Sequence, residues 1–214
     1  MDKINFFRKK FYDIEYPAPL AQPDQSWQQD VEQLYRAEVE KSGRNYIRDE
    51  YVVSIITQLA SWIVGDYTSC LICGGVGLGK TAILKALIRI FDNYRDPINI
   101  PPLRCRALVY ADASELCHRY VANDDVRYEM HNFKLLVIDD VGCEEDYYQW
   151  FGNKIVPVKE IILARYALRL PTILATNLMP QQFAERYGNR VADRVNELYE
   201  IIVCSDHESF RRIK

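Results

Sequence analysis

The sequence lacks any apolar run that approaches the roughly 18–20 residues needed to cross a membrane. Its first ten residues, Met1 to Lys10, also lack the apolar core and the cleavage site of a secretory signal peptide. Internal repeats and low-complexity tracts are missing as well. These absences argue against a membrane or secreted protein and predict a cytoplasmic one. The 214 residues, 49% of them hydrophobic, are enough for one α/β domain with a short appendage.

An excess of positive charge is also missing, since 27 Lys and Arg stand against 30 Asp and Glu, for a net charge of -3. Nucleic-acid-binding domains commonly carry a basic surface that attracts phosphates over a distance. Any contact of this chain with nucleic acid must therefore come from a local basic patch.

Cysteine occurs six times, but no second C-x-x-C accompanies the pair Cys70 and Cys73. A structural zinc site usually needs four Cys or His ligands, and this pair supplies only two. The pair also lies in a short apolar stretch typical of a strand, so it has no helix N-terminus of its own to activate a thiol. We therefore expect buried thiols and no metal or redox site here.

A glycine-rich stretch at residues 73–81 matches G-x-x-x-x-G-K-[ST] at every position. Glycines allow successive backbone N–H groups to point at phosphate oxygens, the lysine reaches the β- and γ-phosphates, and the threonine hydroxyl is a ligand for Mg²⁺. A short apolar strand precedes the stretch, and a helix follows whose positive N-terminal end faces the triphosphate. The pattern predicts a site for ATP and Mg²⁺ formed by Gly74, Gly75, Val76, Gly77, Leu78, Gly79, Lys80, Thr81 and Ala82.

A second motif at residues 135–140 consists of four apolar residues followed by Asp139 and Asp140. An unbroken apolar run is typical of a buried parallel strand, and ligands in such sheets bind at the carboxyl ends of the strands. Downstream of a phosphate loop, this is the pattern of a Walker B strand. We expect Asp139 to hold the Mg²⁺, directly or through water, and Asp140 to orient or deprotonate the attacking water.

Strand patterns alternate with helix patterns along the chain. Helices are expected at about 26–41, 49–64, 82–88, 112–121 and 157–169, and strands at about 69–72, 107–110, 135–140 and 171–177. This alternation predicts an α/β fold, a parallel sheet with helices on both faces. Residues 142–153 are expected to form an acidic, aromatic loop.

We expect two parts in the chain, an N-terminal arm and helix at residues 1–43 and one domain at residues 44–214. Residues 1 to about 25 open basic and aromatic and continue into a proline-containing stretch at residues 16–23, which excludes a regular helix or a central strand there. This arm either lies on the surface of the domain or docks to another protein.

Basic and aromatic residues are interleaved ahead of the Walker B strand. Such a mixture suits single-stranded nucleic acid, because bases stack on rings while cations meet phosphates. The candidate contacts to DNA are Arg119, Arg127 and Tyr128. The same mixture also suits a solvated helical hairpin, and both interpretations stay open.

Residues 185–195 are dense in arginine for a chain of negative net charge. One interpretation is a solvated helix. The other is that Arg194 or Arg190 reaches the γ-phosphate of a neighbouring subunit. The spacing alone does not decide between them.

In this order, the segments resemble the AAA+ ATPases of the DnaC/IstB group, which are bacterial replicative helicase loaders and their transposition relatives. The resemblance covers roughly residues 44–214 and rests on the phosphate loop followed by Leu-Leu-Val-Ile-Asp-Asp-Val-Gly, Thr-Ile-Leu-Ala-Thr-Asn-Leu, Gly-Asn-Arg-Val-Ala-Asp-Arg-Val and a closing Ser-Phe-Arg. It implies that Asn177 is the sensor 1 residue and that Arg194 is an arginine finger, with Arg190 as a second contact. It further implies a nucleotide-dependent homo-oligomer, single-stranded DNA, and a replicative helicase or a transposase as partners.

Two departures from the family pattern stand out. Asp140 occupies a position where many AAA+ proteins have glutamate, and the sequence stops soon after the Arg194 segment, without a helical lid or a sensor 2 arginine. We predict a slow ATPase, stimulated by DNA or a partner, that acts as a helicase loader-like switch in DNA replication. The alternatives are an IstB-like ATPase that assists transposition, a P-loop small-molecule kinase, and an interaction protein that binds ATP with little turnover.

Overall fold

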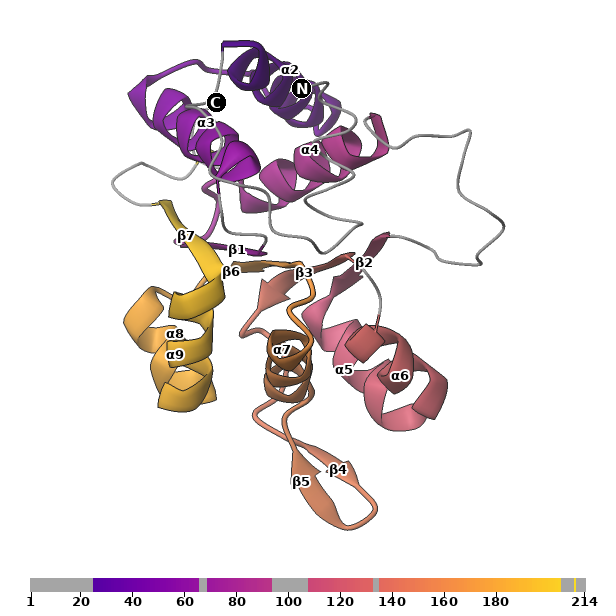
Figure 1. Ribbon diagram of the computed structural model, residues 1–214. Helices are drawn as coiled ribbons and strands as arrows, with labels where there is room; N and C mark the ends of the chain where they lie inside the picture. The colour runs from indigo at the N-terminus through magenta and orange to yellow at the C-terminus, as the bar shows by residue number, and fades with distance from the viewer. Residues whose placement is uncertain (1–24, 66–68, 94–107, 133–134, 205–209, 211–214) are drawn as a thin grey trace, which may run out of the picture.

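The computed structural model describes residues 25–65, 69–93, 108–132, 135–204 and 210 (Figure 1). The expected N-terminal arm and two of the three residues of the closing Ser-Phe-Arg lie outside the described residues. None of the helices in these ranges is both long and apolar enough to cross a membrane.

A five-stranded parallel sheet forms the centre of the molecule, in the order β2-β3-β6-β1-β7. Its strands are β1 (Ser69–Gly74), β2 (Leu108–Asp112), β3 (Leu135–Val141), β6 (Thr172–Thr176) and β7 (Tyr199–Cys204). Every residue of β1 and β6 is buried, as expected for strands covered on both faces. The α/β fold with a parallel sheet, expected from the sequence, is confirmed.

Helices cover both faces of the sheet (Figure 1). The first layer contains α2 (Gln25–Lys41), α3 (Glu50–Val64) and α4 (Lys80–Asn93), and the second contains α5 (Ala113–Ala122), α6 (Asp124–Asn132), α7 (Pro157–Ala167), α8 (Pro180–Tyr187) and α9 (Asn189–Leu198). Successive residues of a strand point to opposite faces, so Ile72 packs in the first layer and Leu71 in the second. The sheet therefore separates two hydrophobic cores. No helical lid follows β7 within the described residues.

Helix α2 is part of the first core. Trp27, Val31 and Tyr35 are buried in the same cluster as α3 and α4. The buried carboxylate of Glu38 forms an ion pair with Arg89 of α4, with Oε1 and Nε 2.7 Å apart. The boundary expected at residue 43 therefore does not separate this helix from the domain that follows it.

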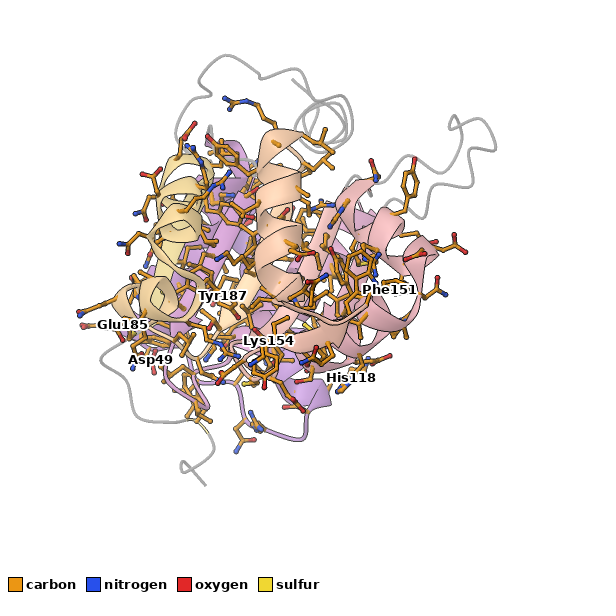
Figure 2. The ribbon with its side chains drawn as sticks, turned by 90° about the horizontal axis from the view of Figure 1, so that it is seen from below. Asp49, His118, Phe151, Lys154, Glu185 and Tyr187 are labelled. Atoms are coloured by element: carbon orange, nitrogen blue, oxygen red, sulfur yellow. The ribbon has the colours of Figure 1, made fainter. Side chains whose placement is uncertain are left out.

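The segment 142–153, expected to be a loop, contains most of a β-hairpin. Strands β4 (Tyr148–Trp150) and β5 (Asn153–Ile155) pair in antiparallel fashion and project away from the sheet (Figure 1). The turn between them is formed by Phe151 and Gly152, both with positive φ, and Figure 2 labels Phe151 on this hairpin. A strand of three residues is too short to show the alternation of apolar and polar residues by which strands are recognised in a sequence.

The helical hairpin that the sequence left open around Arg119 and Tyr128 is present as α5 and α6, whereas the division at the arginine-rich segment and β7 were missed. Gly188 has φ +90° and ends α8, so that the expected single helix becomes two. At the other helix end, α7 stops two residues before the expected Arg169, which itself has φ +51°. A left-handed residue cannot continue a right-handed helix, which explains both breaks.

Arg165 of α7 is completely buried beneath the second helical layer. Its guanidinium donates to Thr172 Oγ1 at 2.7 Å and to the carbonyl oxygens of Pro171 and Met130 at 2.7 and 3.1 Å. Burial lowers its pKa to about 10. This one side chain thereby joins α6, α7 and the start of β6.

We expect Arg165→Leu to lower the free energy of unfolding by about 3 kcal/mol, because two buried carbonyls lose charged donors. Urea denaturation measures this change. Arg119→Leu is the matched control: Arg119 is 60% exposed and lies 3.8 Å from Glu115, so its loss should change stability by less than about 0.5 kcal/mol. Equal effects of the two substitutions would show that Arg165 does not stabilise this junction.

Candidate functional site

The phosphate loop connects β1 to α4 at the carboxyl end of the sheet. Two of its glycines are required by their surroundings as well as by their backbone angles. A Cβ at Gly74, where φ is +146°, would collide with the carbonyl oxygen of Cys204. A Cβ at Gly79, where φ is +85°, would lie 2.6 Å from the phenolic oxygen of Tyr35. No other residue type fits this path of the backbone without a shift of its neighbours.

Lys80 begins α4 and extends back across the loop. Its ammonium donates to the carbonyl oxygens of Gly74 and Gly75 at 2.8 and 2.7 Å, and the residue is 6% exposed. Burial lowers the pKa of Lys80, while the negative charges of Asp140 and Asp139 act in the opposite direction. The site thus holds a desolvated cation with two carboxylates near it, which is the environment that a triphosphate with a metal ion requires.

Two tyrosines of the first helical layer support the loop. Tyr51 of α3 donates its hydroxyl to the carbonyl oxygen of Leu78 at 3.0 Å. Tyr35 of α2 contacts the loop at Gly79, and burial raises its pKa to about 12, so its phenol remains neutral. The loop is therefore held in shape by side chains outside the glycine-rich motif.

Asp139 is a buried carboxylate at the end of β3. It accepts hydrogen bonds from the Tyr110 hydroxyl at 3.0 Å and from the backbone N–H of Asp140 at 2.9 Å. Mg²⁺ takes one or two protein oxygens together with phosphate oxygens and water, and the Asp139 carboxylate and the Thr81 hydroxyl in the first turn of α4 are oxygens of this kind. Tyr110, on the adjacent strand β2, was not foreseen as a partner of this carboxylate.

Asp140 has φ +52°, a left-handed conformation that is uncommon for a residue with a side chain. The turn is closed by a hydrogen bond from the Cys143 N–H to the Asp140 carbonyl oxygen at 3.0 Å. With this backbone the residue lines the same cleft as Lys80 and Thr81, whereas Asp139 is almost completely covered. Backbone strain of this kind is characteristic of functional sites.

Asn177 follows the end of β6 and lines the cleft as well. β6 lies between β1 and β3, so the ends of all three strands reach one edge of the sheet. The Asn177 amide also contacts the Cys143 sulfur, with Nδ2 and Sγ 3.8 Å apart. The structure therefore brings together the expected residues Lys80, Thr81, Asp140 and Asn177.

The cleft has a volume of about 590 Å³ and carries cations that the motifs did not indicate. Lys41 and Arg44 line it from the end of α2 and the loop that follows, and Lys85 and Arg89 line it from α4. No local signal marks these residues, because they come from different parts of the chain and meet only in the folded protein.

A smaller hollow of about 210 Å³ adjoins the cleft. The two share Ser42, Arg44, Gly79 and Ala82. The remaining walls of the hollow are mostly apolar or aromatic: Tyr35, Val39, Gly43, Asn45, Tyr46, Ile47, Val52 and Phe210. A cationic cleft that continues into an apolar hollow matches the two ends of a nucleotide, and the sequence motifs gave no indication of the hollow.

The arginines expected to act on a neighbouring subunit do not line this cleft. Arg194 of α9 donates to the Tyr166 hydroxyl at 3.1 Å, lies 3.4 Å from Glu197, and has its guanidinium 4.7 Å from the centre of the Tyr166 ring. Arg190 is exposed on the same helix. Both residues belong to the helical layer opposite α4 (Figure 1).

The three candidate DNA contacts do not form one uniform patch. Arg119 and Tyr128 are exposed. Arg127, by contrast, is half-buried, with its guanidinium 4.1 Å from the centre of the Trp150 ring and an ion pair to Asp124 at 2.8 Å. Arg127 thus fastens the β4–β5 hairpin to α6.

The burial expected for the two thiols of the cysteine pair is confirmed. Cys70 and Cys73 are buried, and burial raises the pKa of Cys73 to about 11, so its thiol stays protonated at neutral pH. Among the described residues, no group of three or more His, Cys, Asp or Glu side chains is arranged to hold a metal ion.

The sequence and the structure of this chain were compared with those of known proteins. No family model matches the sequence. The AMPPCP-bound DnaA of Aquifex aeolicus superposes with a TM-score of 0.55 at 20% identity, over 78% of this chain and 50% of that one. DnaI superposes with a TM-score of 0.53 at 19% identity, over 80% of this chain and 93% of that one. The chain has the AAA+ ATPase fold.

Two further likenesses concern DnaA. A structure of replication initiator DnaA bound to AMPPCP and single-stranded DNA superposes with a TM-score of 0.52 at 19% identity, over 78% of this chain and 50% of that one. The chromosomal replication initiator protein DnaA of Methylobacillus flagellatus is 29% identical over 104 residues, 45% of this chain. The chain spans 22% of the length of that curated relative.

We expect Lys80→Ala to weaken binding of a nucleoside triphosphate by about 10- to 100-fold, because the charged donor at the loop is lost. Titration calorimetry with Mg·ATP measures this effect. The matched control is Lys159→Ala, on α7 in the opposite layer, which should bind as the parent does. Unchanged binding by Lys80→Ala would show that the glycine-rich loop is not the phosphate site.

Proposed function

We propose that this chain binds Mg·ATP in the cleft and hydrolyses it as an AAA+ ATPase of DNA replication. The observation that carries the proposal is the convergence of Lys80, Thr81, Asp140 and Asn177 on one cationic cleft at the carboxyl ends of β1, β3 and β6. Ligands of open parallel sheets bind at this edge. The likeness to AMPPCP-bound DnaA supports a nucleotide as the ligand.

In the proposed complex, the phosphate chain lies along the loop and the base enters the adjoining hollow. The Lys80 ammonium exchanges its bonds to the loop carbonyls for bonds to phosphate oxygens, and the N-terminus of α4 adds its partial positive charge. Mg²⁺ would neutralise charge on the phosphates, held by Thr81 and Asp139. Asp140 and Asn177 face the same cleft and orient the water that attacks the terminal phosphate.

We expect Asp140→Asn to bind Mg·ATP as the parent does while its kcat falls by about 100-fold or more, because an amide cannot accept the water's proton. Parallel measurements of Kd and of phosphate release separate the two effects. Equal losses of binding and turnover would instead assign Asp140 to the metal. Asp146→Asn, in the exposed loop before the hairpin, is a carboxylate control that should leave both quantities unchanged.

We further propose that the ATPase is a helicase loader-like switch with single-stranded DNA and a replicative helicase as partners. The likeness to DnaI and to DnaA bound to single-stranded DNA supports this reading. Exposed Arg119 and Tyr128 are the proposed DNA contacts, and Arg127 supports them by its packing against the hairpin. A steady-state ATPase assay with and without single-stranded DNA tests the proposal. A rate that is the same with and without DNA would contradict single-stranded DNA as a partner.

The third proposal is an arginine finger that acts in trans. Arg194 lies away from the cleft of its own subunit, as such a finger must, and head-to-tail contacts between copies would bring it to the next site. Its planar guanidinium can contact two phosphate oxygens at once.

We expect Arg194→Ala to bind ATP normally but to hydrolyse it at least tenfold more slowly than the parent. Mixed with Lys80→Ala, it should regain turnover, because fingers of the Lys80→Ala subunits reach the intact sites of the Arg194→Ala subunits. A mixture of Lys80→Ala with Asp140→Asn is the matched control. It should stay inactive, because every subunit then has a defective site of its own. Absence of rescue in the first mixture, with assembly intact, would remove Arg194 from this role.

A further inference from the structure

Phe210, near the end of the chain, lies against the phosphate loop. Its backbone N–H donates to the carbonyl oxygen of Gly77 at 3.1 Å. Its ring lies 5.8 Å from the ring of Tyr51, at an interplanar angle of 50°. Tyr51 in turn donates its hydroxyl to the Leu78 carbonyl oxygen. Phe210 and Tyr51 therefore contact two successive residues of the phosphate loop and contact each other.

The same Phe210 is one wall of the hollow that adjoins the cleft. Tyr46 and Ile47, from the segment between α2 and α3, line it too. Gly79 and Ala82, which belong to both the hollow and the cleft, connect this space to the phosphate site. If the phosphates of a nucleotide lie along the loop, the hollow with Phe210 in its wall is the adjoining space that its base could enter.

From this placement we infer that Phe210 is the residue on which the nucleotide base stacks, and that its bond to Gly77 couples the base to the phosphate loop. The inference rests on the proposed binding of ATP. A phenyl ring has no hydrogen-bonding group, so it contacts the base through its aromatic surface and forms no hydrogen bonds with the polar edge of the base. Its contribution is therefore specific for ligands that carry a base and absent for the phosphates alone.

Two ligands separate this role from general packing. Inorganic triphosphate has the phosphate chain of ATP without the ribose and the base, whereas ATP carries all three parts. We expect Phe210→Ala to weaken binding of Mg·ATP on the order of tenfold, the scale of one base–aromatic stack, and to leave binding of Mg·triphosphate unchanged. Phe210→Trp retains an aromatic face and should retain ATP affinity within about threefold. Titration calorimetry gives all of these constants.

A phenylalanine distant from the hollow provides the matched control. Phe151, at the tip of the β4–β5 hairpin, is 86% exposed, and Phe151→Ala should leave binding of both ligands unchanged. Binding of triphosphate by Phe210→Ala also reports that the phosphate loop is intact in that variant.

The outcomes that would overturn the inference are distinct. If Phe210→Ala binds ATP as tightly as the parent, the base does not stack there. If it binds ATP more tightly, the ring obstructs the hollow instead of forming its wall. Equal losses for ATP and triphosphate would mean that Phe210 acts on the loop alone. A parent protein that binds neither ligand would overturn the proposed nucleotide site itself, and the inference with it.

Discussion

Gly74 has no space for a side chain, because the carbonyl oxygen of Cys204 occupies the place where a Cβ would lie. Gly74 is the last residue of β1 and pairs with Cys204, the last residue of β7. The phosphate loop therefore leaves the sheet at a point fixed by a strand far along the chain. Phe210, which comes after β7 in the sequence, donates its backbone N–H to Gly77 in the same loop. The shape of the phosphate site depends on this contact between the two strand ends.

The other polar groups of the site depend on strand order in the same way. β6 separates β1 from β3, so Asn177 reaches the cleft between Lys80 and Asp140. Cys143 connects Asp140 with Asn177: its N–H donates to the Asp140 carbonyl oxygen, and its sulfur contacts the Asn177 amide. A displacement of the strained turn at Asp140 would thus shift Cys143, which in turn would shift the Asn177 side chain.

Sequence reasoning predicted the parts of the site whose chemistry needs consecutive residues. The phosphate loop, the Walker B strand and the Thr-Asn end of β6 are local patterns, and the structure places all three at one edge of the sheet. It did not predict β7, the hollow or the support from Tyr35, Tyr51 and Tyr110, because each depends on residues that meet only through the fold. Arg127 shows the same limit: its sequence neighbours indicate a nucleic-acid contact, whereas its ring partner, Trp150, lies on another element.

The charge of the cleft is opposite to that of the chain, and its cations differ in their exposure to water. The chain carries a net charge of -3, yet Lys41, Arg44 and Lys85 line the cleft together with Lys80. The first three are exposed, so salt screens their attraction for a polyanion. Lys80 is buried, and the same burial that lowers its pKa also protects its field from screening. A buried ammonium is destabilised unless an opposite charge replaces the water that it has lost. Phosphate oxygens are charged and the loop carbonyls are neutral, so phosphate oxygens would stabilise the Lys80 ammonium more strongly. The burial of Lys80 therefore favours a phosphate chain over an uncharged ligand.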